Sequence, residues 1–450
     1  MSYYLQLLVK KFSFLFIFLL FPIMIYAQSN DFIGTKIQEL NGKIKIQTFP
    51  EKNNSESQPI EGYLNEFKPK EGDHYVLGGS ILWWTSDLGT NAIANTVALN
   101  NDADVDVTAW GLNNMRVSKY TNENNTPNWE FSTNPVDPNI DVAKLGEYIS
   151  VTAGTDFYIF DTTGTQLFDY TLPDSFYASF AGISRDGSWA VFLASSQGSS
   201  TTSRAYGVDV SGGSPTIAWT IDVPTTEIGN WTGVNFAANS SKVVINGRYH
   251  IYVLNQSDGS LIWDGFADNT ESPVVISGDG NVIVSADNSG FVKTLVYNSS
   301  SGNYEQIWQY KIPPTDGFTN WASSVGISAN GNTIVAGTLM FYTSHYDGWV
   351  IAFDTYGNGT PKWIYSGAGD LVDDIAVSDD GRVAAAATWG DLNQTNRNDL
   401  LVFDVETGQM TYQVTTPGSF FTCDISPDGK KVFAGGKAVH AREFGNGGRI

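Results

Sequence analysis

Acidic side chains are abundant in this sequence, and they raise the question of a metal site first. The segment 101–106 (NDADVD) spaces three Asp residues as the start of a calcium loop does, but it lacks the glycine and the distal glutamate of such a loop. It also falls on the first hairpin turn of the repeat described below, so we interpret the segment as a turn rather than as a calcium site. None of the four histidines stands in a HExxH motif or another recognised ligand spacing. The sequence therefore predicts no metal site.

Motifs for nucleophilic catalysis are also missing. A GxSxG elbow and a glycine-rich phosphate loop both need a strand that runs into a helix, and no convincing helical stretch exists to build one. Cys423 is the only cysteine, so no intrachain disulfide can form. We therefore predict no catalytic residue from motifs. Whether the chain is an enzyme stays open, with a non-enzyme favoured.

Aromatic side chains give a clearer trace of binding. Trp and Tyr beside Asp or Asn can stack on sugar rings and hydrogen-bond to hydroxyls, or anchor a protein partner. For two of the candidates, Trp231 and Trp321, the alternative is that they only fill gaps between structural units. The candidate binding residues are Trp231, Trp321, Tyr342, His345, Tyr346, Trp389 and Asp391.

A repeat provides the elements that must position these residues. One half is a small apolar residue, Ser, a turn residue, Asp or Asn, and Gly, between two apolar runs. An Asp-Gly or Asn-Gly pair between apolar runs predicts a hairpin, because Gly accepts the positive φ of such turns. Clear copies begin at Ile183, Ile276, Ile327, Val377 and Ile425, with a weaker copy at Phe236. Successive copies are 40 to 53 residues apart, the size of a propeller blade.

The other half of the repeat is an apolar strand, a polar turn and a strand that carries Trp. Each unit thus has four short strands, which makes one blade of an all-β propeller. We expect the repeated Trp to fill the gap between neighbouring blades rather than to contact a ligand. These tryptophans are Trp129, Trp219, Trp263, Trp308 and Trp363.

Counting the units predicts about eight blades, with seven as the alternative. The segment 75–83 matches the closing Trp hairpin of a blade, so we expect strands from both ends of the chain to share one blade and to close the ring. The propeller is expected over residues 74–450, preceded by a leader or linker at 28–73. Residues 1–27 have the form of a signal peptide, with Lys10 and Lys11, an apolar run and a cleavage site after Ala27.

The apolar-Asp-x-x-Gly turn followed by a Trp strand resembles the repeat of PQQ-type quinoprotein propellers, and more loosely that of WD40 and YVTN-like propellers. The lines LNQSDGSLIWDGF (254–266) and FDTYGNGTPKWIYSG (353–367) carry this resemblance. Quinoprotein dehydrogenases of this family use adjacent cysteines, a calcium site and PQQ, and a chain with Cys423 alone cannot supply the cysteine pair. The resemblance is closer to the non-catalytic PQQ-like proteins, which implies a binding or assembly platform without a cofactor.

The long loops indicate which face binds. In a propeller, the loop between the second and third strands and the connection into the next blade open on the same face. Second-to-third loops are long around 195–204, 339–346 and 389–399, and the turns of the opposite face stay short. Most candidate aromatics lie in or beside these loops. We therefore expect the loop-rich face to be the binding face.

The sequence thus favours an exported, monomeric, non-catalytic propeller that binds a protein or a glycan and is secreted, periplasmic or at the cell surface. The net charge of −22 disfavours a nucleic-acid partner, and no later segment is apolar enough to span a membrane. The alternative is an enzyme: either a quinoprotein-like oxidoreductase with PQQ and calcium, or a hydrolase that uses channel-lining carboxylates such as Asp373 and Asp374.

Overall fold

The computed structural model describes residues 45–48, 82, 85–90, 92–102, 104–111, 115–121, 124–133, 138–197, 201–393, 397–445 and 447–450. Contacts divide the chain into residues 1–42 and 43–450, and all described residues belong to the second unit. The expected signal peptide at 1–27 lies outside the described residues. The single helix among the described residues is α2 (Thr225–Ile228).

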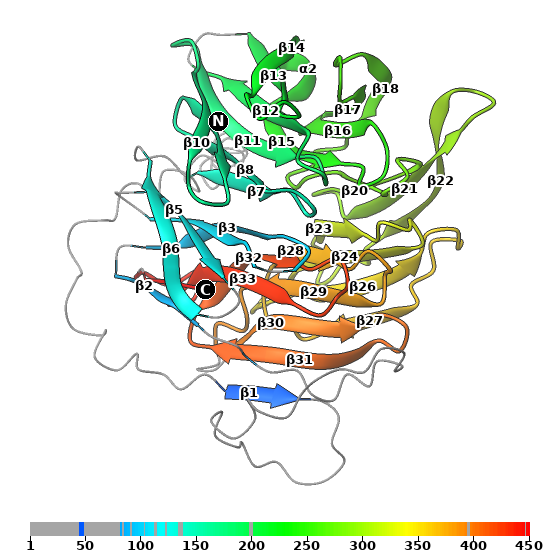
Figure 1. The fold of residues 1–450 in the computed structure, drawn as a ribbon. Helices are drawn as coiled ribbons and strands as arrows, with labels where there is room; N and C mark the ends of the chain where they lie inside the picture. The colour runs from blue at the N-terminus through cyan, green and yellow to red at the C-terminus, as the bar shows by residue number, and fades with distance from the viewer. Residues whose placement is uncertain are drawn as a thin grey trace, which may run out of the picture. The chain divides into compact units, whose positions relative to one another are not determined.

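The described strands form eight antiparallel sheets that follow one another in a ring, and we number them as blades 1 to 8 (Figure 1). Blade 1 consists of β3 (Ala94–Leu99), β4 (Asp106–Trp110), β5 (Arg116–Thr121) and β6 (Asn124–Ser132), and blade 2 of β7 (Asn139–Val142), β8 (Tyr148–Ala153), β9 (Asp156–Asp161) and β10 (Gln166–Thr171). Blade 3 consists of β11 (Phe176–Ile183), β12 (Trp189–Ser196), β13 (Thr202–Asp209) and β14 (Thr216–Pro224), and blade 4 of β15 (Trp231–Phe236), β16 (Lys242–Gly247), β17 (His250–Asn255) and β18 (Leu261–Phe266).

Blades 5 to 7 continue the same up-and-down order. Blade 5 consists of β19 (Val275–Ile276), β20 (Val282–Ala286), β21 (Phe291–Asn298) and β22 (Asn303–Lys311). Blade 6 consists of β23 (Trp321–Ile327), β24 (Thr333–Phe341), β26 (Trp349–Asp354) and β27 (Trp363–Ser366), and the short β25 (Tyr346–Asp347) pairs with β24. Blade 7 consists of β28 (Val372–Val377), β29 (Val383–Thr388), β30 (Arg397–Asp404) and β31 (Gln409–Thr416).

Blade 8 is shared between two distant parts of the chain, which confirms the expected ring closure. It contains β32 (Ser419–Ile425), β33 (Val432–Lys437) and β34 (Gly448–Arg449), and its outermost strand is β2 (Asp87–Gly89). Ser86 and Ile450 exchange backbone hydrogen bonds of 2.9 and 3.1 Å beside this pairing. Most of the segment 75–83, which was expected to supply the closing hairpin, lies outside the described residues.

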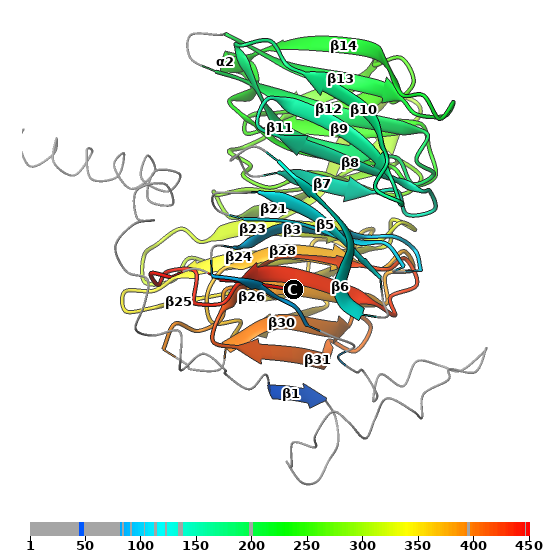
Figure 2. The same cartoon turned by 60° about the vertical axis from the view of Figure 1, so that its left-hand side comes forward.

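A fifth strand lies on the outer edge of blade 7. β1 (Lys45–Thr48) pairs antiparallel with β31, as Figures 1 and 2 show. An unpaired outer strand exposes a row of backbone donors and acceptors, and this pairing covers them. Part of the predicted 28–73 leader is therefore a strand.

The innermost strand of every blade lines a central channel of about 330 Å³. Its wall combines aliphatic side chains such as Val97, Ile276 and Val377 with charged residues such as Lys144 and Asp424. The connections between strands distinguish the two faces of the propeller. The turns between the first and second strands open on one face, which we call the turn face. The second-to-third loops and the connections between blades open on the other, which we call the loop face.

The Ser-x-Asp-Gly motif forms the turn that its sequence predicts. In blade 3 the hydroxyls of Ser184 and Ser188 both donate to the carboxylate of Asp186, each over 2.7 Å, and Gly187 has a φ of +74°. These internal hydrogen bonds hold the pKa of Asp186 below its ordinary value, although burial opposes them. The Asp of this motif is therefore a turn former.

The repeated tryptophans lie between blades, as expected. The indole N–H of Trp219 in blade 3 donates to the carbonyl of Gln256 in blade 4 over 2.8 Å, and Trp363 reaches Val405 in the next blade in the same way, also over 2.8 Å. Trp129 and Trp308 repeat this hydrogen bond. Each indole thus fills an interface between sheets and satisfies its own donor.

Candidate functional site

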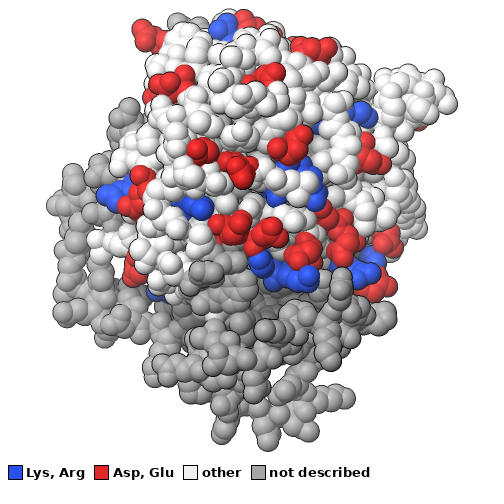
Figure 3. Space-filling model, in the orientation of Figure 1, with Lys and Arg blue, Asp and Glu red and all other residues white. Residues whose placement is uncertain are grey.

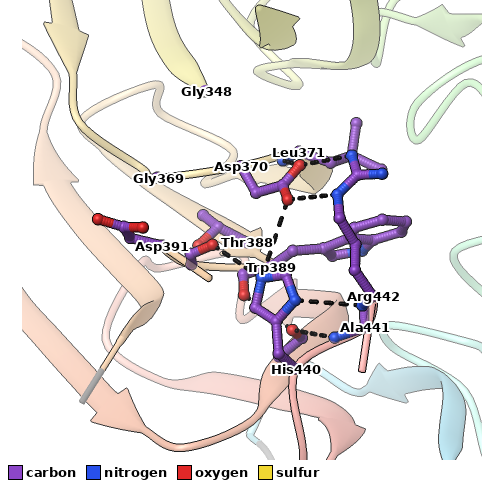
Figure 4. A network of polar contacts seen from close by, with 12 residues as sticks. Gly348, Gly369, Asp370, Leu371, Thr388, Trp389, Asp391, His440, Ala441 and Arg442 are labelled. Carbon is purple, nitrogen blue, oxygen red and sulfur yellow. Dashed lines mark hydrogen bonds and ion pairs between the residues drawn. The ribbon is translucent and has the colours of Figure 1, made fainter. Parts of the chain in front are cut away.

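The longest second-to-third loop on the loop face belongs to blade 8. It joins Lys437 to Gly448 and lies against the corresponding loops of blades 6 and 7 and the connection that enters blade 7. The polar contacts among these loops are drawn in Figure 4. We call Tyr346, Asp370, Trp389, His440 and Arg442 the loop cluster.

Arg442 and Asp370 form the centre of the loop cluster. The guanidinium donates from Nε to Asp370 Oδ2 over 2.6 Å and from its terminal nitrogen to Oδ1 over 2.8 Å, which is a bidentate pair (Figure 4). The Asp370 side chain is only 1% exposed, whereas that of Arg442 is 22% exposed. A buried carboxylate thus fixes an arginine that still reaches solvent.

His440 lies next to this ion pair, and its hydrogen bonds define the tautomer of its ring. Its Nε2 lies 3.0 Å from the carbonyl oxygen of Gly390, which can only accept, and its Nδ1 accepts the backbone N–H of Arg442 over 3.1 Å. Both contacts are satisfied by a neutral imidazole with the proton on Nε2. The fully buried ring therefore ties the blade 8 loop to the loop of blade 7.

Two aromatic rings enclose the guanidinium. Its carbon lies 3.7 Å from the ring centroid of Tyr346 and 5.1 Å from that of Trp389. Ring contacts continue on either side, from Tyr346 to Phe341 (5.9 Å) and from Trp389 to Phe421 (6.1 Å). Arg442 is thus held by cation–π contacts from blades 6 and 7 in addition to its ion pair.

Two glycines allow the loops of blades 6 and 7 to come this close. A Cβ at Gly348 would lie 2.1 Å from the carbonyl oxygen of Asp370. Gly369 has a φ of +86°, and a Cβ there would lie 2.3 Å from the backbone nitrogen of Asp391. Any side chain at either position would push these loops apart, so the glycines help to place Asp370 beside Arg442.

The two carboxylates proposed for hydrolysis have different surroundings. Asp374 accepts the backbone N–H groups of Cys423 (3.0 Å) and of Ile375 (2.9 Å), and so fastens blade 7 to blade 8. Asp373 accepts the indole N–H of Trp389 over 2.9 Å. Burial raises the pKa of Asp373 to about 7, against the effect of that hydrogen bond. Asp374 is therefore committed to backbone donors, while Asp373 borders the loop cluster.

Solved structures with similar folds are β-propellers. The chain is similar to the β-propeller domain of Cps50 (Swd1) from Myceliophteria thermophila, with 11% identity and a TM-score of 0.50 over 73% of this chain and 98% of that one. It is also similar to Sqt1 from Saccharomyces cerevisiae (10%, TM-score 0.56, 75% and 89%) and to Chaetomium thermophilum Sqt1 bound to the N-terminus of the ribosomal protein L10 (10%, TM-score 0.58, 77% and 94%).

At these identities the likeness shows the fold alone. It confirms the looser resemblance to WD40-like propellers at the level of architecture. No protein-family model matches the chain, and no curated protein matches its sequence. The PQQ-like resemblance therefore stays a prediction.

The structure brings two of the sequence-predicted binding residues together. Tyr346 and Trp389 enclose Arg442 in the loop cluster. Asp391 lies in the same loop as Trp389 and accepts the backbone N–H of Asn393 over 2.8 Å, which stabilises the turn. Tyr346 and Trp389 thus meet at Arg442 although they come from different blades.

The other candidates lie further from the cluster. Tyr342 and His345 stack on each other at the tip of the blade 6 loop, with ring centroids 4.5 Å apart. Trp321 contacts Phe341 at the start of blade 6 (5.1 Å). Trp231 is only 3% exposed, and its indole donates to a backbone carbonyl of blade 3, so we leave it out of the proposed site.

Sequence reasoning missed Asp370, His440 and Arg442. The blade 8 loop follows the last clear repeat and precedes a two-residue strand, so the pattern gave no sign of its length. Phe421 was also missed, although aligning the blades reveals it: the equivalent residue in blades 3, 4 and 6 is Ser or Thr. Comparison of repeats could have found Phe421, whereas the partners of Arg442 are visible only in the fold.

Proposed function

We propose that this chain is an exported, non-catalytic propeller that captures a protein partner through the loop face of blades 6 to 8. The observation that carries this proposal is Arg442, held between Tyr346 and Trp389 by the buried Asp370. Trp, Tyr and Arg are the residues that most often dominate the energetics of protein interfaces. Because these side chains are already fixed, little conformational entropy remains to be lost on binding.

Exposed apolar side chains on the same face support this proposal. Phe318 lies in the connection that enters blade 6 and Phe444 in the blade 8 loop, and both are exposed. Phe444 is 78% exposed, and Leu392 beside Trp389 is exposed as well. Large exposed apolar side chains on the same face as a fixed polar centre are typical of interaction surfaces.

Charge and targeting complete the proposal. The chain carries a net charge of −22, and on the face drawn in Figure 3 Asp and Glu side chains are widespread while Lys and Arg gather in fewer places. Such a surface suits a partner with basic groups and disfavours nucleic acid. We propose export from the signal-peptide form of residues 1–27, to the periplasm, the cell surface or the medium. No helix among the described residues is long and apolar enough to cross a membrane.

The enzyme alternative lacks a specific observation in its favour. No three His, Cys, Asp or Glu side chains in the described part of the chain converge so as to hold a metal ion. The described residues therefore show no cluster of acidic side chains for the calcium that the quinoprotein alternative needs, and we propose no step through that group. Asp374 accepts backbone donors and Asp370 is paired with Arg442, so neither carboxylate beside Asp373 is free to act as the second acid of a hydrolase.

A capture experiment tests the proposed function. The purified protein, the double variant Tyr346→Ala with Trp389→Ala, and the control Tyr356→Ala are immobilised and exposed to proteins secreted by the source organism. Tyr356 is exposed on the turn face. We expect the parent and the control to retain a partner that the double variant loses by at least about tenfold, with Tm changed by only a few degrees.

Equal capture by the double variant would contradict the proposal. A glycan array screened with the same three proteins separates the two ligand classes. Binding of an oligosaccharide that depends on Tyr346 and Trp389, without any captured protein, would move the function to glycan recognition.

A further inference from the structure

Six innermost strands carry a β-bulge at the same place in the repeat. In each, the pairing with the second strand shifts by one residue near the loop face. The bulged residue stands four positions before the last residue of the strand, and a bulge turns this side chain away from the regular alternation. The bulged residues are Asn95, Ser179, Thr232, Ser323, Asp373 and Phe421.

In blades 3, 4 and 6 the bulged residue is a small hydroxyl residue whose hydrogen bond stays within the propeller wall. The Ser179 hydroxyl lies 2.6 Å from that of Ser195, and Thr232 accepts from Asn246 Nδ2 over 2.6 Å. Ser323 donates to a backbone carbonyl of blade 7 over 2.6 Å. These positions thus hold the propeller wall together, within one blade at Ser179 and Thr232 and between two blades at Ser323.

Blades 7 and 8 depart from this pattern beside the loop cluster. Their bulged residues are Asp373 and Phe421, and Trp389 contacts both, through its indole N–H (2.9 Å) and its ring (6.1 Å). All three side chains are partly accessible to solvent. A carboxylate and an aromatic ring thus replace small polar groups at the loop-face ends of two neighbouring innermost strands, and Trp389 lies against both.

Among the described residues, no cation forms an ion pair with Asp373. Its neighbours Asp374 and Asp370 are also acidic, and the nearby guanidinium of Arg442 is already paired with Asp370. A half-buried carboxylate with one neutral donor is electrostatically unsatisfied, and a ligand cation would compensate it.

We propose that Asp373, Trp389 and Phe421 form a subsite that receives one cationic side chain, Arg or Lys, of the protein partner. Carboxylate and aromatic faces together are the groups that bind guanidinium and ammonium ions best. This inference deepens the proposed function and rests on it. The acidic character of the chain makes a basic partner segment the complementary choice.

Calorimetry with short peptides tests the subsite. The probes are acetyl-Gly-Arg-Gly-amide and its citrulline analogue, which has nearly the same shape without the charge. We expect the parent to bind the arginine peptide at least about tenfold more tightly than the citrulline peptide, and Asp373→Asn to lose that preference. Asn can still accept the Trp389 indole N–H. Asp169→Asn, an exposed carboxylate on the outer strand of blade 2, is the charge-matched control.

The pH dependence gives a second measurement. Because burial raises the pKa of Asp373 to about 7, the carboxylate is largely protonated at pH 5.5, and arginine-peptide binding by the parent should be several-fold weaker than at pH 8. Phe421→Ala should also weaken binding, and it serves if Asp373→Asn fails to fold. Equal affinity for both peptides, or an unchanged preference in a folded Asp373→Asn variant, would overturn the subsite. Partner capture that still depends on Tyr346 and Trp389 would then leave the proposed function standing.

Discussion

Asp106 is a buried carboxyl group that works against the stability of the fold. It is only 4% exposed, and its Oδ1 accepts no hydrogen bond among the described residues. Burial raises its pKa to about 7 from an ordinary value of 3.8, although Lys431 and Lys119 act in the opposite direction. The folded state thus binds this proton more tightly than the unfolded chain does, so the contribution of Asp106 to stability falls as pH rises from about 4 to about 7.

We predict that Asp106→Asn is more favourable at pH 8 than at pH 5. Relative to the parent, the free energy of unfolding of the variant should be higher by about 2 kcal/mol at pH 8 than at pH 5, because Asn removes the cost of a buried charge. Urea unfolding at the two pH values measures this difference. The control Asp169→Asn should show no such pH dependence, and a variant effect that is the same at both values would refute the interpretation.

Single residues also show where prediction from sequence ends. Tyr346 and Trp389 were predicted because aromatic residues in long loops are recognisable in the sequence. Asp370 and Arg442 were not, because an acid and a base 72 positions apart give no local pattern. Trp231 is buried, unlike the loop aromatics. The sequence alone could not decide whether Trp231 binds a ligand or fills a gap between structural units.

Among the structural elements, the outer hairpins of blades 2, 4, 6 and 7 each have a glycine that lies against the tryptophan of the preceding blade. Gly408 has a φ of +69°, and a Cβ there would lie 2.7 Å from Trp363 Cγ. Gly213, in the equivalent turn of blade 3, has a φ of +68° but nothing within 4 Å of its Cβ position. The two glycines therefore share the backbone requirement and differ in packing.

We predict that Gly408→Ala destabilises the protein by about 2–3 kcal/mol and Gly213→Ala by about 1 kcal/mol. In both variants the alanine must adopt a positive φ, which costs free energy. Only Gly408→Ala must also displace the Trp363 indole, which packs between two blades. Denaturant unfolding of the two variants and the parent measures the difference. Equal losses would show that the tryptophan does not hold this interface as described.

The same elements explain how far the fold could be predicted. Turn glycines and strand tryptophans recur at blade-sized spacing, so the eight blades and their closure followed from the sequence. The bulges could not be predicted, because a one-residue shift in pairing leaves no mark in the alternation of a buried inner strand. The blade 8 loop was missed because its blade lacks the Trp hairpin.

At the scale of the whole molecule, ring closure brings the site together. Tyr346, Trp389 and Arg442 come from blades 6, 7 and 8, and they meet only because these blades stack side by side around the channel. β2 pairs with β34 and so ties blade 8, which carries Arg442, to the start of the propeller. Placement of the candidate site thus depends on closure of the ring.

Site-specific photo-crosslinking in the secreted protein mixture tests most directly whether the loop face of blades 6 to 8 binds the partner. A benzophenone amino acid replaces Phe444, which projects from the blade 8 loop without joining the loop cluster, or Tyr356 on the turn face, which is 63% exposed. We predict a crosslinked protein from position 444 and none from position 356, with the 444 product lost when Trp389→Ala is added. The same product from both positions, or a product from position 356 alone, would contradict the account.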